Sequence, residues 1–302
     1  MTKTAWVVYR KAVKIDADIY HFHDPELIPI GLLLKHHGKR VVYDVHEDVP
    51  RQILSKEHIL GLFRKPVSAF IEALEAFSSK RFDAVVTATP FIDRRFSELG
   101  ATTVNVNNFP IVSELNSAQN NWEMKEKAVC YVGGIARIRG AIEMVEAIGK
   151  TSYGLLLAGG IETILERKLM KLSGWSQVET FGFINRTGVR AVMARSMAGL
   201  VLLYPVVNYR DALPVKMFEY MSAGIPVIAS SFPLWIKILN ENDCGICVDP
   251  LNVDEIADAI RWIVDHPLEA KRMGENGRRA VTEKYNWEIE ERKILKLYSL
   301  LS

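Results

Sequence analysis

The sequence predicts an α/β protein made of two units, each built around a parallel β-sheet. Its 302 residues exceed one ordinary compact domain and suit two of roughly 120 to 180 residues each. From residue 128 onwards, short apolar runs alternate with segments of helical periodicity, and the N-terminal part shows a similar alternation. Strands that alternate with helices form parallel sheets, in which ligands bind beyond the carboxyl ends of the strands.

The composition is that of a folded protein without a membrane span. Hydrophobic residues account for 49% of the chain and charged residues for 25%, and the net charge of +2 gives no general reason to expect nucleic-acid binding. The longest apolar run, residues 198–207, covers about half of a membrane span, and no signal peptide is evident. Cys130, Cys244 and Cys247 are too few, and odd in number, for a disulfide framework. We therefore expect a protein of the cytoplasm.

In the N-terminal part, two predicted strands end in polar side chains. Strands are predicted within residues 18–24, 39–48, 82–90 and 103–110, with a helix over 25–38. His23 ends the first strand, and His46 and Glu47 end the second. Parallel strands end at the same edge of a sheet, so these side chains are expected to face the same cleft. The polar stretch 113–127 predicts a linker to the second unit.

In the C-terminal part, the alternation is regular. Strands are predicted within residues 128–134, 153–160, 178–183 and 198–205, separated by helices within 138–150, 161–172 and 185–196. Gly133 and Gly134 follow the first of these strands and allow the backbone to approach a ligand closely. Arg139 adds positive charge near the start of a helix whose amides can receive phosphate.

The helix after the last of these strands carries the strongest functional signal. Pro214 favours its first turn, and Gly224 ends it. Lys216 and Glu219 are three residues apart and therefore share one face of this helix. A cation that can hold phosphate then lies beside a carboxylate that can accept two vicinal hydroxyls, which suits the diphosphate and ribose of a nucleotide. Asp211 precedes Glu219 by eight residues, across the loop that enters the helix.

These patterns resemble those of a known enzyme family. The stretch K-x-x-E-Y-M-x-A-G-x-P-V-I-A-S from Lys216 onwards, with Asp211 before it, resembles the donor-site signature of the GT4 family of retaining GT-B glycosyltransferases. The family has Glu where this chain has Asp211, whose side chain is one methylene shorter. The stretches Y-H-F-H-D-P-E from Tyr20 and Y-D-V-H-E from Tyr43 are similar to the signatures of the family's N-terminal domain.

The resemblance implies the GT-B fold, in which two Rossmann-like domains face a cleft. It places a partial acceptor-side domain at residues 1–118, a nucleotide-sugar-binding domain at 119–285, and at 286–302 a helix that returns to the first domain. Family members open with a strand, a glycine-rich loop and further βα units before the strand that corresponds to 18–24. We therefore expect an incomplete N-terminal sheet with an apolar edge, which another chain or segment covers, and weak transfer by this chain as it stands.

The resemblance also implies the substrates and the roles of single residues. The reaction moves a hexosyl unit from a UDP- or GDP-sugar to a glycan or polyprenyl-linked acceptor of cell-surface polysaccharide synthesis, with an α-linked product and without a metal or other cofactor. The implied donor site consists of Gly133, Gly134, Arg139 and Lys216 at the diphosphate, Glu219 at the ribose, Phe183 at the base and Leu213 at the sugar. The implied catalytic residues are His23, Asp211 and Lys216, and the implied acceptor side is His46 and Glu47.

Two other functions remain open. A non-catalytic subunit that binds a sugar nucleotide would keep the C-terminal residues without the family's N-terminal loop, and ligand binding without turnover would identify it. A nicotinamide-dependent oxidoreductase shares the βαβ alternation, but neither glycine-containing turn, after residue 132 or after residue 158, has the G-x-G-x-x-G spacing that such an enzyme needs.

Three further patterns have ordinary explanations beside functional ones. His21 and His23 on one strand could form a metal pair, but neutral, hydrogen-bonded histidines are commoner, and no third ligand is evident from the sequence. Cys244 and Cys247 form a C-x-x-C pair, which is half of a zinc site and is expected to be structural. Residues 51–74 mix basic and apolar side chains, so contact with the inner face of a membrane and packing in the core are both open.

Overall fold

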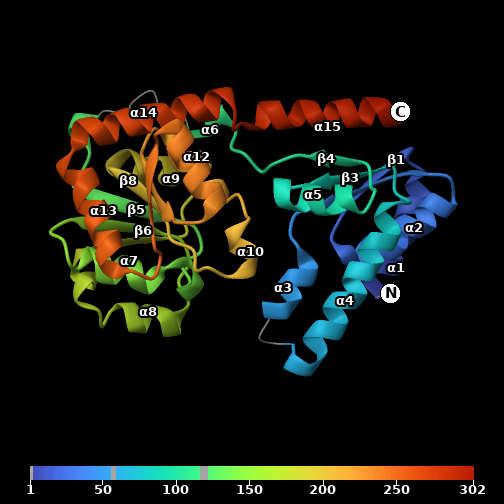
Figure 1. Ribbon diagram of the computed structural model, residues 1–302, viewed down its shortest axis with the longest axis horizontal. Helices are drawn as coiled ribbons and strands as arrows, with labels where there is room; N and C mark the ends of the chain where they lie inside the picture. Colours follow the sequence, from blue (N-terminus) through green and yellow to red (C-terminus); the bar gives the residue numbers. More distant parts are fainter. Residues whose placement is uncertain (1–2, 56–58, 116–121) are drawn as a thin grey trace. The chain divides into compact units, whose positions relative to one another are not determined.

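The chain folds into two α/β units (Figure 1). The structure is a computed structural model that describes residues 3–55, 59–115 and 122–302. The first unit comprises Met1–Asn108, Val206–Ala212 and Glu288–Ser302, and the second comprises Phe109–Pro205 and Leu213–Trp287. Within the described residues, each unit contains one parallel sheet, with four strands in the first and six in the second. The predicted fold class and the smaller first sheet are therefore confirmed.

The sheet of the first unit has the parallel strand order β1, β2, β3, β4. The unit contains α1 (Lys3–Ile15), β1 (Ile19–His23), the 3-10 turn η1 (Pro25–Leu27), α2 (Ile28–His36), β2 (Arg40–Val45), α3 (Val49–Ser55), α4 (Gly61–Ser79), β3 (Ala84–Thr87), α5 (Pro90–Glu98), β4 (Thr103–Asn105), α10 (Val207–Arg210) and most of α15 (Trp287–Leu301). Tyr43, Val85 and Phe96 are among the buried residues of its core. The register of β1 and β2 pairs His23 with Asp44, so both lie at the carboxyl edge of this sheet.

Helix α1, which the sequence analysis did not predict, packs beside the edge strand β1. Its Ala5 is buried, and the carbonyl of its Ala12 accepts a hydrogen bond of 2.8 Å from the hydroxyl of Tyr20 in β1. The large apolar side chains of α1 that face solvent are Trp6, Val7, Val8, Val13 and Ile15. Helix α1 therefore carries an exposed apolar surface.

Helix α15 joins the first unit although it ends the chain. Its buried Glu290 accepts a hydrogen bond of 3.0 Å from the backbone amide of Asn107. Further along the helix, the hydroxyl of Tyr298 lies 2.6 Å from Nδ1 of His21 in β1. The last residues of the sequence thus contact segments that precede them by more than half of the chain.

The segment 51–74 forms parts of α3 and α4, and its residues 56–58 lie outside the described part of the chain. Polar side chains of α4, such as Ser68 and Glu75, are buried. The exposed apolar side chains of the same helix are Leu62, Phe63, Val67, Phe70 and Phe77. The large apolar residues of α4 therefore do not serve mainly to fill a core. Across the described residues, none of the helices combines the length and apolarity that a bilayer crossing requires.

The sheet of the second unit has the parallel order β10, β9, β8, β5, β6, β7. The unit contains α6 (Val112–Leu115), η2 (Trp122–Met124), β5 (Ala128–Val132), η3 (Arg137–Arg139), α7 (Ala141–Ile148), β6 (Gly154–Ala158), α8 (Thr163–Leu169), η4 (Ser173–Gln177), β7 (Val178–Gly182), α9 (Arg186–Arg195), β8 (Ala198–Val201), α11 (Val215–Ala223), β9 (Val227–Ser230), α12 (Pro233–Asn242), β10 (Gly245–Val248), α13 (Val253–Asp265) and α14 (Pro267–Glu283). Of the predicted linker 113–127, residues 116–121 lie outside the described part.

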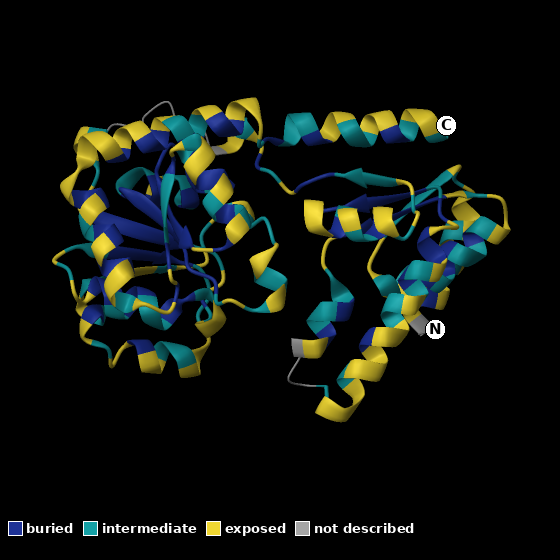
Figure 2. Ribbon diagram, in the orientation of Figure 1, coloured by how far each residue is buried: buried dark blue, intermediate teal, exposed yellow. Residues whose placement is uncertain are grey.

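Helices cover both faces of this second sheet. Leu200 of β8 lies in the main core with Met144 of α7 and Ile260 of α13. An added Cβ on its neighbour Gly199 would clash with the ring of Tyr220 on α11. Since successive residues of a strand point to opposite faces, α11 covers the face opposite to α7. Figure 2 shows the buried strands enclosed by helices whose outer sides are exposed.

The strand order places a topological switch point beside β5. From β5 the sheet continues through β6 and β7 on one side, while β8, β9 and β10 lie on the other side. In open parallel sheets, ligands bind outside the carboxyl ends of the strands at such a point. The segments that follow β5 and β8 are therefore expected to bind the ligand, and the segment after β8 leads to α11.

Candidate functional site

Glycine turns from three strands meet at the carboxyl edge of the second sheet. The amide of Gly159, after β6, donates to the carbonyl of Gly182 at the end of β7 over 2.8 Å, and the amide of Gly133, after β5, donates to the carbonyl of Ala158 over 2.8 Å. Gly159 has a φ of +146°, and an added Cβ there would clash with the carbonyl oxygen of Gly133. Only glycine fits this approach, so the turns lie close together and leave backbone open to a ligand.

Lys216 reaches this edge from the first turn of α11. Its Nζ donates to the hydroxyl of Tyr131 over 2.7 Å, and that hydroxyl donates to the carbonyl oxygen of Gly134 over 2.9 Å. The same Nζ lies 4.0 Å from the centre of the Tyr131 ring, where a cation is attracted to the π-electrons. An added Cβ on Gly133 would lie 3.2 Å from it. The ammonium group is therefore held at the two glycines predicted for the diphosphate.

Arg139 brings a second cation to the same turn. Its Nη1 donates to the carbonyl oxygen of Gly134 over 3.1 Å, from the 3-10 turn η3 that separates β5 from α7. Burial lowers the pKa of Lys216 to about 7, the charge of Arg139 lowers it as well, and the charge of Glu219 opposes both. Two cations held together in a partly desolvated place favour an anion between them, because the anion stabilises both charged forms.

Glu219 lies on α11 one turn after Lys216, with its side chain 13% exposed. Nη1 of Arg186, the first residue of α9, donates to Oε1 of Glu219 over 2.6 Å. The same guanidinium also donates to Glu114 over 2.9 Å. Two vicinal hydroxyls at Glu219 would therefore share its carboxylate with Arg186. Arg186 was not predicted from the sequence, where its local signal is its place after Asn185, the residue that caps α9.

Phe183, predicted to cover the base, is 92% exposed directly after β7. An added Cβ on Gly160 would lie 2.7 Å from its ring, so the ring lies against the backbone of the turn after β6. An exposed aromatic ring beside open backbone offers a nucleotide base a stacking surface and hydrogen-bonding groups together.

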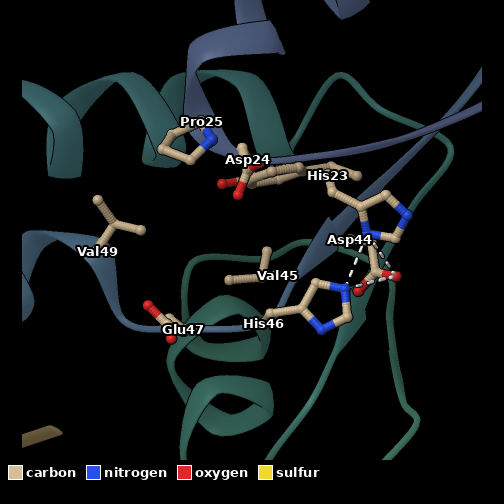
Figure 3. A pocket seen from close by; sticks show the side chains of 9 residues that line it. His23, Asp24, Pro25, Asp44, Val45, His46, Glu47 and Val49 are labelled. Carbon is tan, nitrogen blue, oxygen red and sulfur yellow. Dashed lines mark hydrogen bonds and ion pairs between the residues drawn. The ribbon is translucent and has the colours of Figure 1, made fainter. Parts of the chain in front are cut away.

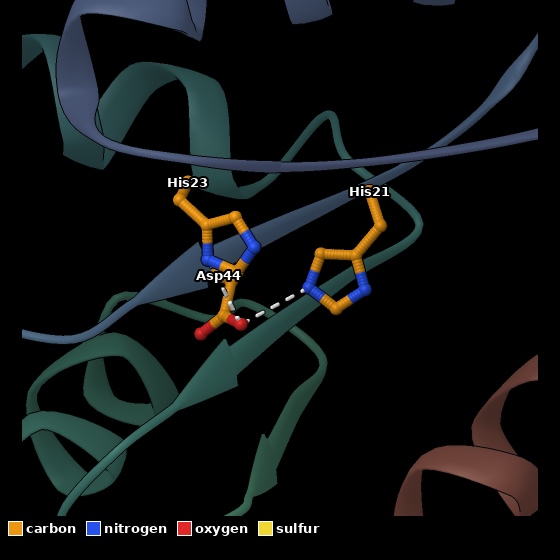
Figure 4. Close-up of side chains that lie close together, drawn as sticks. All are labelled: His21, His23 and Asp44. Carbon is orange, nitrogen blue, oxygen red and sulfur yellow. Dashed lines mark hydrogen bonds and ion pairs between the residues drawn. The ribbon is translucent and has the colours of Figure 1, made fainter. Parts of the chain in front are cut away.

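In the first unit, side chains from the ends of β1 and β2 converge on Asp44 (Figure 3). Nε2 of His21 and Nδ1 of His23 each lie 3.2 Å from Oδ2 of Asp44, and Nε2 of His46 lies 3.4 Å from the same oxygen. Nδ1 of His23 and Nε2 of His46 are 2.8 Å apart. His21, His23 and Asp44 each offer a ligand atom, and these atoms lie within 4.8 Å of one another (Figure 4). Asp44 is the third partner that the sequence did not reveal.

A pocket of about 360 Å³ lies beside this cluster. It is lined by His23, Asp24, Pro25, Tyr43, Asp44, Val45, His46, Glu47 and Val49. Burial opposes the ionisation of Asp44, but hydrogen bonds from His21 and His46 outweigh it and hold the pKa of Asp44 well below its usual value. The hydrogen bond to Asp44 raises the pKa of His46. The pocket therefore combines a stable carboxylate with imidazoles and has a volume typical of small-ligand sites.

The predicted site residues fall into two groups. Gly133, Gly134, Arg139, Phe183, Leu213, Lys216 and Glu219 belong to the second unit, whereas His23, His46, Glu47 and Asp211 belong to the first. Asp211 is exposed and directly follows α10. Tyr131, which links Lys216 to Gly134, was missed because its strand reads simply as buried. Its hydroxyl was a usable signal, since a buried tyrosine hydroxyl normally has a hydrogen-bond partner.

Two family profiles together match most of the chain. The profile of the family described as "Glycosyl transferases group 1" matches residues 112–280, and that of "Glycosyltransferase Family 4" matches residues 1–106. A D-rhamnosyltransferase of Pseudomonas aeruginosa is 21% identical over 272 residues, which cover 86% of this chain and 68% of the relative.

Solved structures show the same fold. A sucrose-phosphate synthase from Thermosynechococcus elongatus is similar with a TM-score of 0.81 at 20% identity, over 99% of this chain and 77% of that one. The Anabaena protein HepE, solved in complex with UDP, has a TM-score of 0.78 at 15% identity, over 98% of this chain and 81% of that one. The first family profile alone covers more than half of the sequence. The chain therefore belongs to the group 1 glycosyltransferases, the GT4 family of GT-B enzymes that use nucleotide sugars.

Proposed function

We propose that this protein transfers a hexosyl unit from a UDP- or GDP-sugar to a hydroxyl group of a glycan or polyprenyl-linked acceptor in cell-surface polysaccharide synthesis. The new linkage is α, with retention at the anomeric carbon. The observation that carries the proposal is the pair of cations, Lys216 and Arg139, held together at the open backbone of Gly133 and Gly134. This pair lies where parallel sheets bind ligands.

On the donor side, Lys216 and Arg139 hold the diphosphate. Negative charge grows on the diphosphate as its bond to the sugar breaks, and preorganised cations and backbone amides stabilise that charge more than they stabilise the intact donor. Glu219 accepts the ribose hydroxyls, and Phe183 covers the base. The UDP bound to HepE supports UDP as the nucleotide.

On the sugar and acceptor side, Asp211 and Leu213 hold the hexosyl unit, and His23 contacts the sugar or the reacting hydroxyl. His46 and Glu47 bind the acceptor. The support for these roles is that His23, His46 and Glu47 line one pocket of the first unit. A neutral imidazole in this pocket can accept a proton from a hydroxyl group.

UDP-glucose and GDP-mannose, each tested without added metal, separate this function from its alternatives. We expect one of them to raise the melting temperature, because a ligand at 100 times its Kd stabilises the folded protein by about 2.7 kcal/mol. Release of the nucleotide in the presence of an acceptor would then show transfer. Binding without release would identify a non-catalytic sugar-nucleotide-binding subunit. If neither compound binds, the proposal is wrong.

Donor binding is expected to weaken as the pH rises. The pKa of Lys216 is about 7 in the free protein, so its ammonium form is lost above that pH. A bound diphosphate raises this pKa, and affinity therefore falls by up to about tenfold per pH unit above the free value. Calorimetric titration with UDP-glucose, between roughly pH 6 and pH 9, measures the slope. The same slope in a Lys216→Met variant would assign the effect to another group.

We also propose that the exposed apolar side of α4 contacts the membrane surface that carries the acceptor. Phe63, Phe70 and Phe77 are exposed at seven-residue spacing, beside the basic Lys65. Flotation with anionic vesicles should be lost in a Phe63→Ser/Phe70→Ser variant and kept in Phe91→Ser, an exposed phenylalanine on α5. Equal flotation of all three proteins contradicts the proposal.

A further inference from the structure

We propose that His21, His23 and Asp44 form a zinc-binding site in the first unit, because each offers a ligand atom and these atoms lie within 4.8 Å of one another. Nε2 of His21 and Nδ1 of His23 each lie 3.2 Å from one oxygen, Oδ2 of Asp44. In a tetrahedral zinc site, metal–ligand distances of about 2.0 to 2.2 Å place neighbouring ligand atoms about 3.3 Å apart. The carboxylate oxygen thus has the separation from each imidazole that shared coordination of one zinc ion requires.

The kinds of ligand also suit zinc. Imidazole nitrogen and carboxylate oxygen are both common zinc ligands, and such a set favours zinc over magnesium or calcium, which prefer oxygen ligands. Nδ1 of His23 and Nε2 of His46 are 2.8 Å apart, a hydrogen-bond distance, so zinc at Nδ1 of His23 would take the place of this hydrogen bond.

The surroundings hold the ligands in place. The register of β1 and β2 sets His23 directly beside Asp44, so the sheet itself fixes two of the ligands. Nδ1 of His21 lies 2.6 Å from the hydroxyl of Tyr298, whose oxygen can accept the N–H of a histidine that binds metal through Nε2. Such outer contacts fix the tautomer and the ring orientation of metal-bound histidines.

A metal ion can reach this place from solvent. The side chains of His23 and His46 are 55% and 42% exposed and line the pocket, whereas that of Asp44 is 11% exposed beneath them. Asp24 and Glu47 line the same pocket and add negative charge, which attracts a divalent cation. The arrangement therefore has an entrance from solvent, an exposed imidazole at His23 and a buried anionic ligand at Asp44.

Bound zinc is expected to inhibit sugar transfer. It would occupy Nδ1 of His23, the residue assigned above to the sugar or the reacting hydroxyl. This consequence rests on the proposed function, whereas the zinc site itself rests on the geometry of the first unit alone.

Titration of the untagged full chain with Zn²⁺ by calorimetry, and with Co²⁺ by visible absorption spectroscopy, tests the site. We expect one ion per chain and the strong absorption typical of four-coordinate cobalt. His23→Gln and Asp44→Asn should weaken binding by tenfold or more, and Tyr298→Phe by about tenfold through loss of the outer contact. The control is a His36→Ala/His37→Ala variant, which removes two exposed histidines at the end of α2.

Several results would overturn the site. They are the lack of saturable binding of one ion, full affinity in folded His23→Gln, and loss of binding in the His36→Ala/His37→Ala control. His23 is exposed, so the His23→Gln variant is expected to fold, and circular dichroism checks this. The zinc site can therefore be tested even if Asp44→Asn misfolds. The titrations need no sugar nucleotide, so failure of the zinc site leaves the donor proposal standing, and failure of donor binding leaves the zinc site standing.

Discussion

Replacing Lys216 by methionine is expected to weaken donor binding by about 10- to 100-fold and to lower transfer by about 10²- to 10³-fold. Methionine keeps the length and the apolar contacts of the side chain but removes the cation beside Gly133 and Gly134. Burial already lowers the pKa of Lys216 to about 7, so the fold bears a cost for this charge. We therefore expect an unchanged or higher melting temperature together with the loss of function, measured by calorimetry and by nucleotide release.

The matched control is Lys237→Met. Lys237 is exposed on α12 and pairs with Glu241 over 3.9 Å, a surface contact of little energetic weight. This variant should bind the donor like the parent chain. Equal losses in the two variants, or full transfer by Lys216→Met, would contradict the role of Lys216.

Replacing Gly159 by alanine is expected to destabilise the second unit by about 3 kcal/mol or more and to abolish donor binding. The φ of +146° is strained for any residue with a side chain, and the new methyl group would clash with the carbonyl oxygen of Gly133. The turns after β5 and β6 would have to separate, which moves the backbone that receives the diphosphate. Chemical denaturation and calorimetric titration measure the two effects.

The Gly100→Ala variant separates the two causes of the expected destabilisation, which are backbone strain and the clash with a neighbouring turn. Gly100 also has a positive φ, +83°, but nothing lies within 4 Å of an added Cβ. Backbone strain alone should cost about 1 to 2 kcal/mol there and leave donor binding intact. If Gly159→Ala costs no more than Gly100→Ala and still binds the donor, the close approach of the turns has no functional role.

The donor-side residues were predictable because local rules place them. Pro214 and Gly224 bound α11 as expected, and the helical period then puts Lys216 and Glu219 on one face. The glycines after β5 likewise follow from the end of one apolar run. Tyr131 and Arg186 were not predictable in their roles, because each meets its partner only after elements far apart in the sequence pack together.

The histidine cluster of the first unit could be predicted only in part. The sequence places His21 and His23 on one strand, but their partner Asp44 lies on another. Which residues stand side by side depends on the register between β1 and β2, and a shift of one residue would turn the Asp44 side chain to the opposite face. Helix α1 was not predicted although its apolar residues recur with helical spacing, and the structure leaves several of them exposed.

The position of α15 also bears on how the protein is made. During synthesis the ribosome releases β1 to β4 before the second unit, yet the buried amide of Asn107 must wait for Glu290, 183 residues later, and His21 for Tyr298, 277 residues later. Contacts so distant in sequence close slowly, because a long loop must be ordered before they form. The β-strands of the first unit are thus translated before the second unit, but their contacts with α15 form only after it, so a nascent chain exposes an incomplete first unit while the second is already folding.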